Sequence, residues 1–384
     1  MRVTIDCRHA GLPGIGRFAV ELTVALRRRA GTDEEVMALV SRRPGGWLGD
    51  ATLSVPAGPP GGDPANLAVA SGPFGPLEQL ELPLLLARHH VQLHHATHLT
   101  LPLALRLPMV LTVHDVHPLV HDDHARSAAA RGYYRLSMPV AVRRARAVVA
   151  VSDYTAAELA RVLGRPADAV IAHGVDHSAW AAATGRAGTG TAAGPGTAAA
   201  GRAGTPQTGY LLYVGTAKPH KNLITLLRAH AGARDDRGEG LPELVLAGPT
   251  AGEVEAVAPG ASAGRVRALG RVADAELPGL YAGAAVVAVP SRYEGFGLTA
   301  LEAMYWGVPV VAADSPGLRD TVADAALLVP ASDPRAWADA LARAAGDPVI
   351  RATLIQRGRA RAGRFRWDDA ADAYLALYRR LVRR

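Results

Sequence analysis

The feature that most constrains this chain is a series of short apolar runs that alternate with helical patterns between residues 210 and 345. Six runs have the pattern of a buried strand: Tyr210–Gly215, Leu244–Gly248, Arg265–Gly270, Ala284–Pro290, Val308–Ala313 and Ala326–Pro330. Helical spacing separates them at Asn222–Ala231, Asp274–Gly283, Leu298–Trp306 and Asp333–Ala345. Apolar strands that alternate with helices predict a parallel sheet covered on both faces, as in a Rossmann-like domain.

The first part of the chain repeats this rhythm less cleanly. Strand patterns cover Arg2–Cys7, Val36–Val40, Val110–His114 and Val148–Ser152, and helical patterns cover Gly16–Arg29 and Tyr154–Leu163. An Ala-, Gly- and Thr-rich stretch without apolar periodicity, 179–208, separates the two parts and predicts a flexible linker or a disordered insertion. The domains expected are therefore an N-terminal one over 1–178 and a C-terminal one over 209–364.

A final segment, 365–384, has the pattern of an amphipathic helix. Ala370, Ala373, Tyr374, Leu377 and Leu381 recur at helical spacing. We expect this helix to pack back on the N-terminal domain. The fold class predicted is α/β, with two Rossmann-like domains facing an interdomain cleft and a C-terminal helix. Ligands of such sheets bind at the carboxyl ends of the strands.

Composition excludes several classes of protein. Apolar residues make up 49% of the chain and charged residues 20%, which excludes a disordered chain, a collagen-like fibre and a coiled coil. A single cysteine, Cys7, excludes a disulfide scaffold and a cysteine-only metal site. No apolar run of about 18 residues and no signal-peptide pattern is present, so we expect a cytoplasmic protein.

The net charge of +7 is compatible with nucleic acid, a membrane surface or an anionic substrate. The arginines are scattered in short runs that are typical of solvated helix faces, and no nucleic-acid motif with interleaved aromatic residues accompanies them. We therefore expect no nucleic-acid partner. Peripheral contact of the arginines with an anionic membrane surface stays open, as does the oligomeric state.

The basic residues are distributed unevenly by type. Only Lys218 and Lys221 are lysines among 42 basic residues, and Asn222 is one of two asparagines. A preference for arginine of this size indicates a GC-rich genome more than a physical demand, yet these three residues persist within five positions. They follow the strand pattern 210–215, where a basic loop suits a phosphate or diphosphate. The alternative is a solvated loop before a helix.

A second motif follows the strand pattern 284–290. Gly295 and Gly297 allow close approach of the backbone to a ligand, and the amides of Phe296, Gly297 and Leu298 are candidate donors at a helix start. If both were helical, Glu294 and Glu302 would lie roughly 80° apart. Glu294 alone could be a favourable charge near a helix N-terminus. Glu302 has apolar neighbours, so it needs a partner if buried, and vicinal ribose hydroxyls would suit it.

This second motif resembles the retaining glycosyltransferases of family 4, which have two domains of the GT-B type. The pair Glu294 and Glu302 forms E-x7-E inside EGFGLTALEAM, followed by GVPVVAAD. Five other stretches are similar to family motifs: Tyr213–Asn222 to YVGT-x-x-PRKN, Val170–Asp176 to VIPNGVD, Val151–Ser152 to a post-strand serine motif, Thr112–Asp115 to an HD motif, and Arg2–Phe18 to an N-terminal glycine loop. The resemblance spans nearly the whole chain except 179–208.

The resemblance implies three catalytic residues. Lys221 would neutralise the diphosphate leaving group, and Glu294 would contact the donor sugar and stabilise developing positive charge. His114 would lie near the donor sugar and assist or position the leaving group. The resemblance also implies donor-binding roles for Thr216, Lys218 and His220 of the basic loop, for Gly16 and Arg17 lining the cleft, and for the backbone at Arg271 and Val272 near the base. The amides of Gly295, Phe296, Gly297 and Leu298 would bind sugar hydroxyls and phosphate, and Glu302 would bind the ribose.

The chain departs from the family pattern at two positions. His220 replaces the arginine before the lysine, and His173 replaces the asparagine of NGVD. Lys218 could supply the charge lost at His220, and a titratable imidazole there could make diphosphate binding dependent on pH. The roles of Lys221 and Glu294 are unaffected.

We expect no metal and no cofactor apart from the nucleotide-sugar co-substrate. The chain contains no D-x-D triplet, and lysine with helix N-termini can replace a metal. Histidines cluster in the N-terminal half, and His117 and His121 could share a helix face as metal ligands do, but polar cleft residues are the favoured interpretation. The cluster comprises His89, His90, His94, His95, His98, His114, His117, His121 and His124. The glycine loop Gly11–Gly16 could instead bind NAD, although its spacing is not G-x-G-x-x-G.

The function predicted is metal-independent transfer of a hexosyl group, mannose by default, from a nucleoside-diphosphate sugar to an acceptor hydroxyl with retention of configuration. The acceptor could be a carbohydrate, a lipid-linked molecule or a small molecule. The alternatives are a sugar-nucleotide epimerase of the same fold, a non-catalytic nucleotide-sugar-binding protein and an NAD oxidoreductase.

Overall fold

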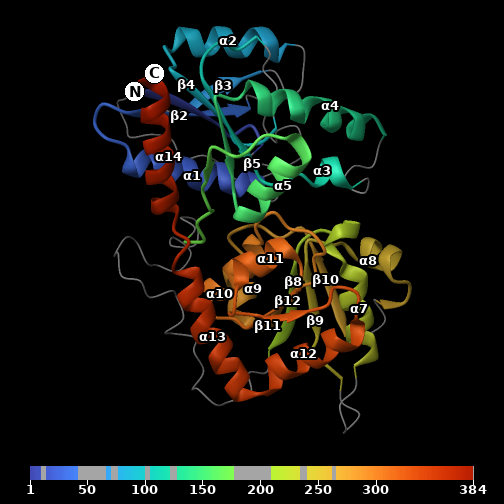
Figure 1. Ribbon diagram of the computed structural model, residues 1–384. Coiled ribbons are helices and arrows are strands. Elements are labelled where there is room, and N and C mark those ends of the chain that lie inside the picture. The colour runs from blue at the N-terminus through green and yellow to red at the C-terminus, as the bar shows by residue number, and fades with distance from the viewer. Residues whose placement is uncertain are drawn as a thin grey trace. The chain divides into compact units, whose positions relative to one another are not determined.

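The computed structural model (Figure 1) describes residues 1–9, 14–41, 66–70, 77–99, 104–121, 128–176, 209–233, 240–261 and 265–383. The predicted linker 179–208 lies outside these ranges. The chain divides into an N-terminal unit, Met1–Gly174 with Arg366–Arg384, and a C-terminal unit, Val175–Phe365. The first unit ends at Gly174, close to the predicted boundary at 178, and resumes at Arg366, next to the predicted boundary at 365, whereas the second unit begins at Val175, well before the predicted start at 209. The C-terminal helix belongs to the N-terminal unit.

The N-terminal unit is built on one parallel sheet of seven strands, in the order β3-β2-β1-β4-β5-β6-β7. Its strands are β1 (Arg2–Asp6), β2 (Glu35–Ser41), β3 (Asn66–Val69), β4 (Leu93–Ala96), β5 (Met109–Val113), β6 (Ala147–Ala150) and β7 (Ala169–Val170). Its helices are α1 (Ile15–Arg29), α2 (Glu78–Arg88), α3 (His117–Val120), α4 (Ala128–Arg144), α5 (Asp153–Leu163) and α14 (Trp367–Val382).

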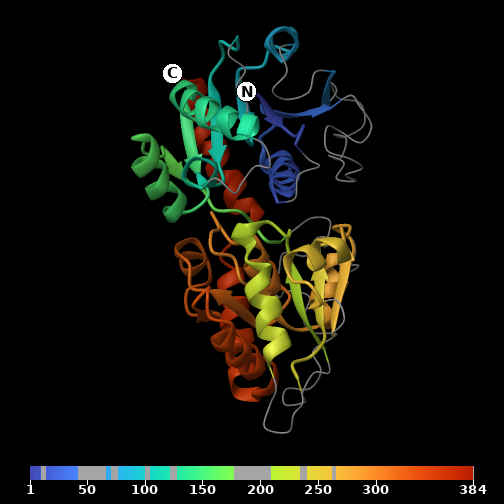
Figure 2. The same ribbon diagram turned by 90° about the vertical axis from the view of Figure 1, so that its right-hand side faces the viewer.

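The C-terminal unit repeats the design with six parallel strands in the order β10-β9-β8-β11-β12-β13. The strands are β8 (Tyr210–Val214), β9 (Leu244–Ala247), β10 (Val266–Gly270), β11 (Ala284–Val289), β12 (Val310–Ala313) and β13 (Leu327–Val329). The helical elements are η2 (Pro219–Lys221), α7 (Leu223–Gly232), α8 (Ala251–Val257), α9 (Leu277–Gly283), α10 (Leu298–Tyr305), α11 (Pro316–Val322), α12 (Pro334–Gly346) and α13 (Pro348–Ala362). Figure 2 shows helices on both faces of this sheet.

Both sheets have a topological switch point, where the strand order changes direction. In the N-terminal sheet it lies between β1 and β4, and in the C-terminal sheet between β8 and β11. The connections on the two sides of such a point run over opposite faces, which leaves a crevice at the carboxyl ends of the strands. The loops after these strands are therefore the places to search for a site in each unit.

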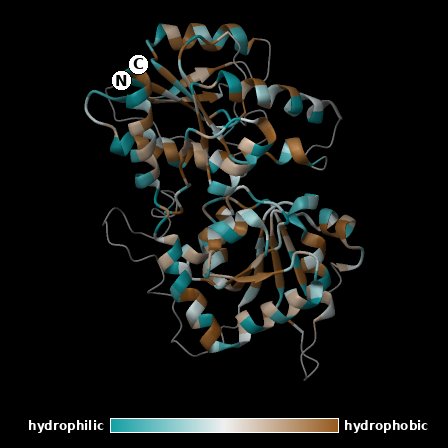
Figure 3. Ribbon diagram, viewed as in Figure 1, coloured by the Kyte–Doolittle hydropathy of each residue, from teal (hydrophilic) through white to brown (hydrophobic). Residues whose placement is uncertain are grey.

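The apolar strands lie inside both units, as their hydrophobic colour in Figure 3 shows. Helix α14 packs along α1 and contributes Tyr374, Leu375 and Tyr378 to the core around β1. Ion pairs Arg28–Asp368 and Arg29–Asp372 join the same two helices at the surface. In the part of the chain that the structure describes, no helix combines the length and the apolarity that crossing a bilayer requires.

Two elements show why part of the N-terminal unit escaped the sequence patterns. Strand β4 consists of LHHA, and its histidines are buried, so its sequence does not read as an apolar run. Strand β3 has only four residues. In the C-terminal unit, α13 has arginines through its length and only three buried residues, which leaves little amphipathic signal.

Candidate functional site

The residues that carry chemistry in the C-terminal unit meet at its switch point. Lys221 ends the turn that follows β8, and Glu294 lies in the loop after β11, the neighbouring strand. The Lys221 ammonium lies 2.6 Å from Glu294 Oε1, and both side chains are partly buried. The two motifs identified in the sequence, 73 residues apart, thus form one charged pair.

Asn222 holds the loops around this pair together. Its backbone is left-handed, with φ of 56°, and its side-chain amide donates to the carbonyls of Pro290 at 3.0 Å and Ala331 at 2.7 Å. Thr225 Oγ1 donates to the Asn222 side-chain oxygen at 2.8 Å. One buried amide therefore connects the loops after β8, β11 and β13. Asn222 stands out in the sequence because asparagine is rare in this chain, but nothing in the sequence pattern predicts this role.

The loop after β11 is tied to the loop after β8 by its backbone as well. The amide of Arg292 donates to the carbonyl of His220 at 2.9 Å. His220 and Thr216 both lie on the loop after β8, as expected, whereas the side chain of Lys218 is exposed at the start of the turn. The Lys221 amide donates to the Lys218 carbonyl at 2.9 Å, which places Lys218 one turn before the ion pair.

The start of α10 explains the glycine of the second motif. Gly297 caps this helix in the left-handed region, with φ of 87°. A Cβ atom at Gly297 would lie 2.7 Å from Leu318 Cδ2, so another residue there would be strained by its backbone conformation and would also have to displace the Leu318 side chain. Thr321 donates to the carbonyl of Phe296, which fixes the loop against α11. Gly295 and Leu298 flank these two residues.

The second glutamate has the partner that its burial demanded. Glu302 is 1% exposed on α10, and Tyr281 of α9 donates from its hydroxyl to Glu302 Oε2 at 2.7 Å. Since α10 begins at Leu298, Glu294 is not helical, and the angular relation expected for two helical glutamates does not apply. The sequence pattern around Tyr281 is that of an apolar helix residue, so it did not predict a place in the site. The signal that could have pointed to it is the Glu302 carboxylate, which needs a buried hydrogen-bond donor.

The floor of this region is built by close backbone contacts. Gly248, after β9, has φ of 120°, and a Cβ there would lie 1.8 Å from the carbonyl oxygen of Gly215. The Tyr213 hydroxyl donates to the carbonyl of Thr216 at 2.7 Å. Burial, with a smaller effect of the Glu294 carboxylate, raises the pKa of Tyr213 well above its usual range. Tyr213 is therefore neutral beside the ion pair.

Arg271 and Val272 follow β10, the edge strand of this sheet. Strands β9 and β8 separate them from the side of β11, and Arg271 is exposed. Their role in binding a base remains a prediction.

In the N-terminal unit, His114 follows β5 and lies in an aromatic cluster. Its Nε2 is 2.8 Å from the carbonyl of Thr97, and its ring meets Phe18 edge-on at 4.8 Å. Burial lowers the pKa of His114 to about 4, against the opposing effect of that carbonyl. The imidazole is therefore neutral at neutral pH, with the proton on Nε2, which favours a positioning role over proton donation.

His173, the departure from the NGVD motif, belongs to the same cluster. It is buried, stacks on Trp367 of α14 at 6.0 Å, and lies 5.2 Å from the ring of His114. The next residue, Gly174, lies against the start of α14: a Cβ atom at Gly174 would lie 2.3 Å from the backbone nitrogen of Trp367. Gly16 and Arg17 occupy the first turn of α1, in this unit, and their part in a donor site stays a prediction.

The other described histidines of the N-terminal cluster lie on β4, in the loop after it, and at the ends of α2 and α3. His94 and His95 are buried on β4, and His98 contacts His9 at 5.0 Å. His117 begins α3, whereas His121 follows the last residue of that helix with an extended backbone, so the two do not share a helix face as expected; their rings nevertheless stack at 4.8 Å. Over the described ranges, no three His, Cys, Asp or Glu residues are grouped as metal ligands would be. His89 and His90 follow α2; His124 and residues 11–13 of the glycine loop lie outside the described residues.

A buried ion triad at the N-terminal switch point was not anticipated. Arg8 binds Asp6 in a fork, with distances of 2.9 and 2.7 Å, and reaches Glu78 at the start of α2 at 2.6 Å. Burial would raise the pKa of Asp6, but the Arg8 guanidinium overcomes this and holds it well below its usual range. The triad fastens α2 to the end of β1.

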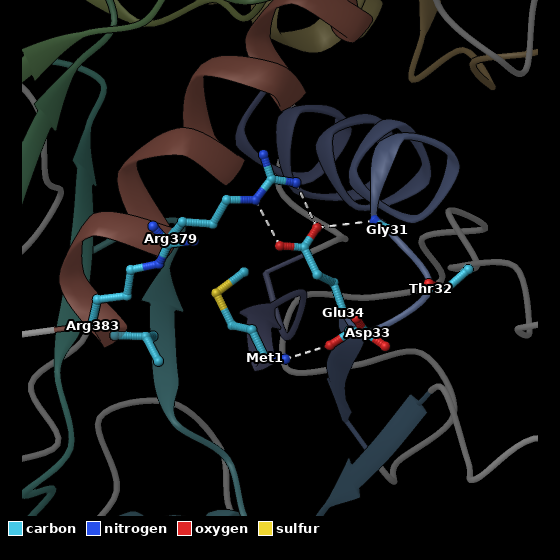
Figure 4. A pocket seen from close by; sticks show the side chains of 8 residues that line it. Met1, Gly31, Thr32, Asp33, Glu34, Arg379 and Arg383 are labelled. Atoms are coloured by element: carbon cyan, nitrogen blue, oxygen red, sulfur yellow. Dashed lines mark hydrogen bonds and ion pairs between the residues drawn. The ribbon is translucent and has the colours of Figure 1, made fainter.

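A pocket lined by Met1, Glu34 and Arg379 lies elsewhere in the N-terminal unit. It is a shallow hollow where β1 and β2 begin, beside the end of α14 (Figure 4). Arg379 pairs with Glu34 at 2.7 Å, and the amino group of Met1 donates to the carbonyl of Asp33. Because ligands of parallel sheets bind at the opposite, carboxyl ends of the strands, this hollow is not the candidate site.

Comparisons with known proteins agree with this geometry. Residues 13–179 match the model of Glycosyltransferase Family 4, and residues 208–347 match that of Glycosyl transferases group 1. D-inositol 3-phosphate glycosyltransferases of Saccharomonospora viridis and Xylanimonas cellulosilytica are 49% and 45% identical over 73 and 78 residues, which is 18% and 20% of this chain. The matches span only 17% and 19% of those relatives.

Solved structures show the same fold over the whole length. Sucrose-phosphate synthase of Thermosynechococcus elongatus aligns with a TM-score of 0.73 at 21% identity, covering 99% of each chain. HepE of Anabaena, in complex with UDP and glucose, aligns with a TM-score of 0.64 at 21% identity, covering 98% of each chain. With two sheets of the GT-B type and family models matching both halves, the chain belongs to glycosyltransferase family 4.

Proposed function

We propose that the protein transfers a hexosyl group from a nucleoside-diphosphate sugar to an acceptor hydroxyl with retention of configuration. The observation that carries the proposal is the pair of Lys221 and Glu294, 2.6 Å apart at the switch point of the C-terminal sheet. A cation and a carboxylate in this place can serve the two charges that develop when a glycosyl bond to a diphosphate breaks.

In the proposed reaction, the bond between the sugar's anomeric carbon and the diphosphate oxygen breaks, and the electron pair leaves with the diphosphate. The Lys221 ammonium stabilises the negative charge on the departing oxygen, and Glu294 stabilises the positive charge on the sugar ring. The acceptor oxygen bonds to the anomeric carbon on the same face. Its proton passes to the departing phosphate, so no protein nucleophile is needed.

The remaining residues of the site serve binding in this proposal. Glu302, held by Tyr281, accepts hydrogen bonds from the vicinal hydroxyls of the ribose. The loop from Gly295 to Leu298 binds sugar hydroxyls and phosphate with its amides. Lys221 supplies the charge that a metal supplies in other transferases, so we propose a metal-independent reaction, whose rate a chelator leaves unchanged.

The donor and the acceptor are the open choices. Mannose on GDP or UDP is our default donor. The complex of HepE with UDP-glucose supports a uridine nucleotide and glucose as a second choice, because the two proteins share their fold. The names of the curated relatives make D-inositol 3-phosphate a candidate acceptor. The alternatives are epimerisation of the nucleotide sugar, binding without catalysis, and oxidoreduction with NAD.

A single experiment separates these functions. The purified chain is first screened by thermal shift against UDP-, GDP- and dTDP-sugars, because a bound ligand raises the melting temperature by mass action. The donor that binds is then incubated with and without acceptors, with D-inositol 3-phosphate among them. Nucleotide release only in the presence of acceptor, with an unchanged anomeric configuration by NMR, supports the proposal.

Each other outcome identifies a different function. Conversion of the nucleotide sugar without acceptor shows an epimerase, and binding with no turnover over the acceptor panel shows a binding protein. A change in reduced-nicotinamide absorbance shows an oxidoreductase. Any of these three results overturns the proposal.

A further inference from the structure

The proposal concerns a surface of the N-terminal unit formed by α2 and α4. Nine large apolar side chains are exposed among the described residues, and five belong to α2, to its N-cap residue or to α4: Leu77, Leu80, Leu84, Leu136 and Val140. Single exposed apolar residues are ordinary, but a concentration of five on two helices marks an interaction surface.

On α2 the exposed residues form one stripe. At about 100° per residue, Leu77, Leu80, Leu84 and Arg88 fall within an arc of about 80°. The three leucines are 68%, 67% and 71% exposed, whereas Leu82 and Leu86, on the other side of the helix, are fully buried. This helix therefore presents an apolar face to the core and a second apolar face, ending in arginine, to the solvent.

Helix α4 presents a stripe of the same chemistry. Leu136, 75% exposed, lies within about 60° of Val140 and Arg143 around the helix. Arg135 is exposed beside Leu136. The helix contains four arginines and no aspartate or glutamate, so its exposed face is apolar and cationic together.

The two stripes lie on neighbouring helices. The backbone amide of Ala104 donates to the side-chain oxygen of Gln79 on α2 at 3.2 Å. Leu105, which follows Ala104, accepts at its carbonyl from the Arg144 guanidinium at the end of α4, at 3.3 Å. The same short segment thus contacts both helices. The carboxylates of α2 are engaged: Glu78 in the buried triad, and Glu81 with the amide of Ala70 at 2.7 Å.

We propose that the α2–α4 face binds the surface of a bilayer that contains anionic lipids. Leucines on a helix face lower their free energy by entering the boundary between headgroups and acyl chains, and arginines beside them pair with lipid phosphates. Because α4 contains no carboxylate, its charge is complementary to a negatively charged surface. A second copy of this chain is disfavoured as the partner, because its same face would bring arginines against arginines. The Arg8 triad holds α2 rigidly in the position from which its leucines point outward.

Co-sedimentation of the full chain with vesicles tests the surface. We expect binding to vesicles of phosphatidylcholine with phosphatidylglycerol, and weaker binding to phosphatidylcholine alone. Salt should weaken the binding because the arginine contribution is screened. The double variant Leu80→Gln/Leu84→Gln should bind at least about tenfold more weakly. Arg135→Gln/Arg143→Gln should lose about fivefold per arginine on anionic vesicles only.

Val349→Gln is the matched control, because Val349 is an equally exposed apolar residue, 73% exposed, and belongs to α13 of the C-terminal unit rather than to α2 or α4. It should bind like the wild type. Melting temperatures equal to that of the wild type show that the variants are folded. No binding to anionic vesicles, equal loss in Val349→Gln, or a wild-type dimer that the leucine variant converts to a monomer would each overturn the proposal.

Discussion

At the scale of single residues, the site explains why Lys221 and Asn222 persist in a chain whose other basic residues are almost all arginine. Lys221 makes a single short contact with one carboxylate oxygen, which suits a compact ammonium rather than a planar guanidinium. Asn222 combines a left-handed backbone with two donated hydrogen bonds to carbonyls. Asparagine tolerates that conformation better than most residues do. Nothing in the structure explains Lys218.

Replacing Lys221 by alanine should reduce turnover by about 10²–10³-fold, because the charge that develops on the leaving diphosphate loses its counterpart. The measurement is kcat with the donor identified by thermal shift. Arg228→Ala is the control, since Arg228 is an exposed cation on α7 to which no role in the site is assigned. Near-normal turnover of Lys221→Ala would remove this residue from the mechanism.

Tyr281→Phe should raise the KM for the donor about tenfold while kcat changes little, because Glu302 loses a hydrogen bond that orients it. Affinities for a nucleoside diphosphate and for its 2′,3′-dideoxy analogue give the specific readout. The wild type should prefer the hydroxylated nucleotide, and the variant should prefer it less. An unchanged preference in the variant would show that Tyr281 acts only on stability.

At the scale of elements, α14 is attached to the N-terminal sheet by a buried polar chain. Tyr378 Oη lies 2.6 Å from His95 Nδ1, and His95 Nε2 lies 2.8 Å from Thr112 Oγ1. Thr112 Oγ1 in turn lies 2.8 Å from Tyr374 Oη. These contacts join the last helix to β4 and β5, about 280 residues earlier in the chain. A polar chain of this kind specifies one docking position for a helix that apolar contacts alone would hold less selectively.

Tyr378→Phe should lower the free energy of unfolding by about 1–3 kcal/mol, because His95 Nδ1 stays buried and loses its partner. Urea unfolding followed by circular dichroism measures the change. Arg380→Gln, on the exposed face of α14, should change stability by less than about 0.5 kcal/mol. Equal stability of Tyr378→Phe and the wild type would show that apolar packing alone holds the helix.

At the scale of the whole molecule, the N-terminal unit contains an unusual number of buried histidines. Burial lowers the pKa of His94 to about 4, against the opposing effect of Asp6. Burial also lowers the pKa of His95 to about 3 and of His114 to about 4. These rings are neutral when folded, but in the unfolded chain they take up protons near pH 6.5. Their neutrality therefore makes stability depend on pH.

The free energy of unfolding should be constant above about pH 6.5 and should fall as the pH drops from about 6.5 towards about 4. In this window the unfolded chain binds protons that the folded chain does not. The loss should be about 2 kcal/mol for each of the three histidines between about pH 7 and about pH 5. Urea unfolding at both values measures it, and His94→Gln should reduce the slope. A pH-independent stability over that window contradicts the prediction.

The sequence by itself determined the local elements and the family. The apolar runs predicted all six strands of the C-terminal sheet to within two residues at each end, because a strand buried in a parallel sheet shows its environment in its own residues. The glycines of the second motif and the lone lysines pointed to the two loops that form the site. The family resemblance rested on those same residues.

Only the tertiary structure decided which residues become partners. The pairing of Lys221 with Glu294, the tether at Asn222 and the hydroxyl that Tyr281 gives to Glu302 all join separate strand–helix units. Strand β4 becomes a strand although its histidines are polar, because Thr4, Thr112 and Tyr378 supply hydrogen bonds from elsewhere in the chain. The periodicity of a sequence indicates which residues are buried. It does not identify the hydrogen-bond partner that a buried polar residue needs, because that partner lies far away in the sequence and is brought close only by the tertiary fold.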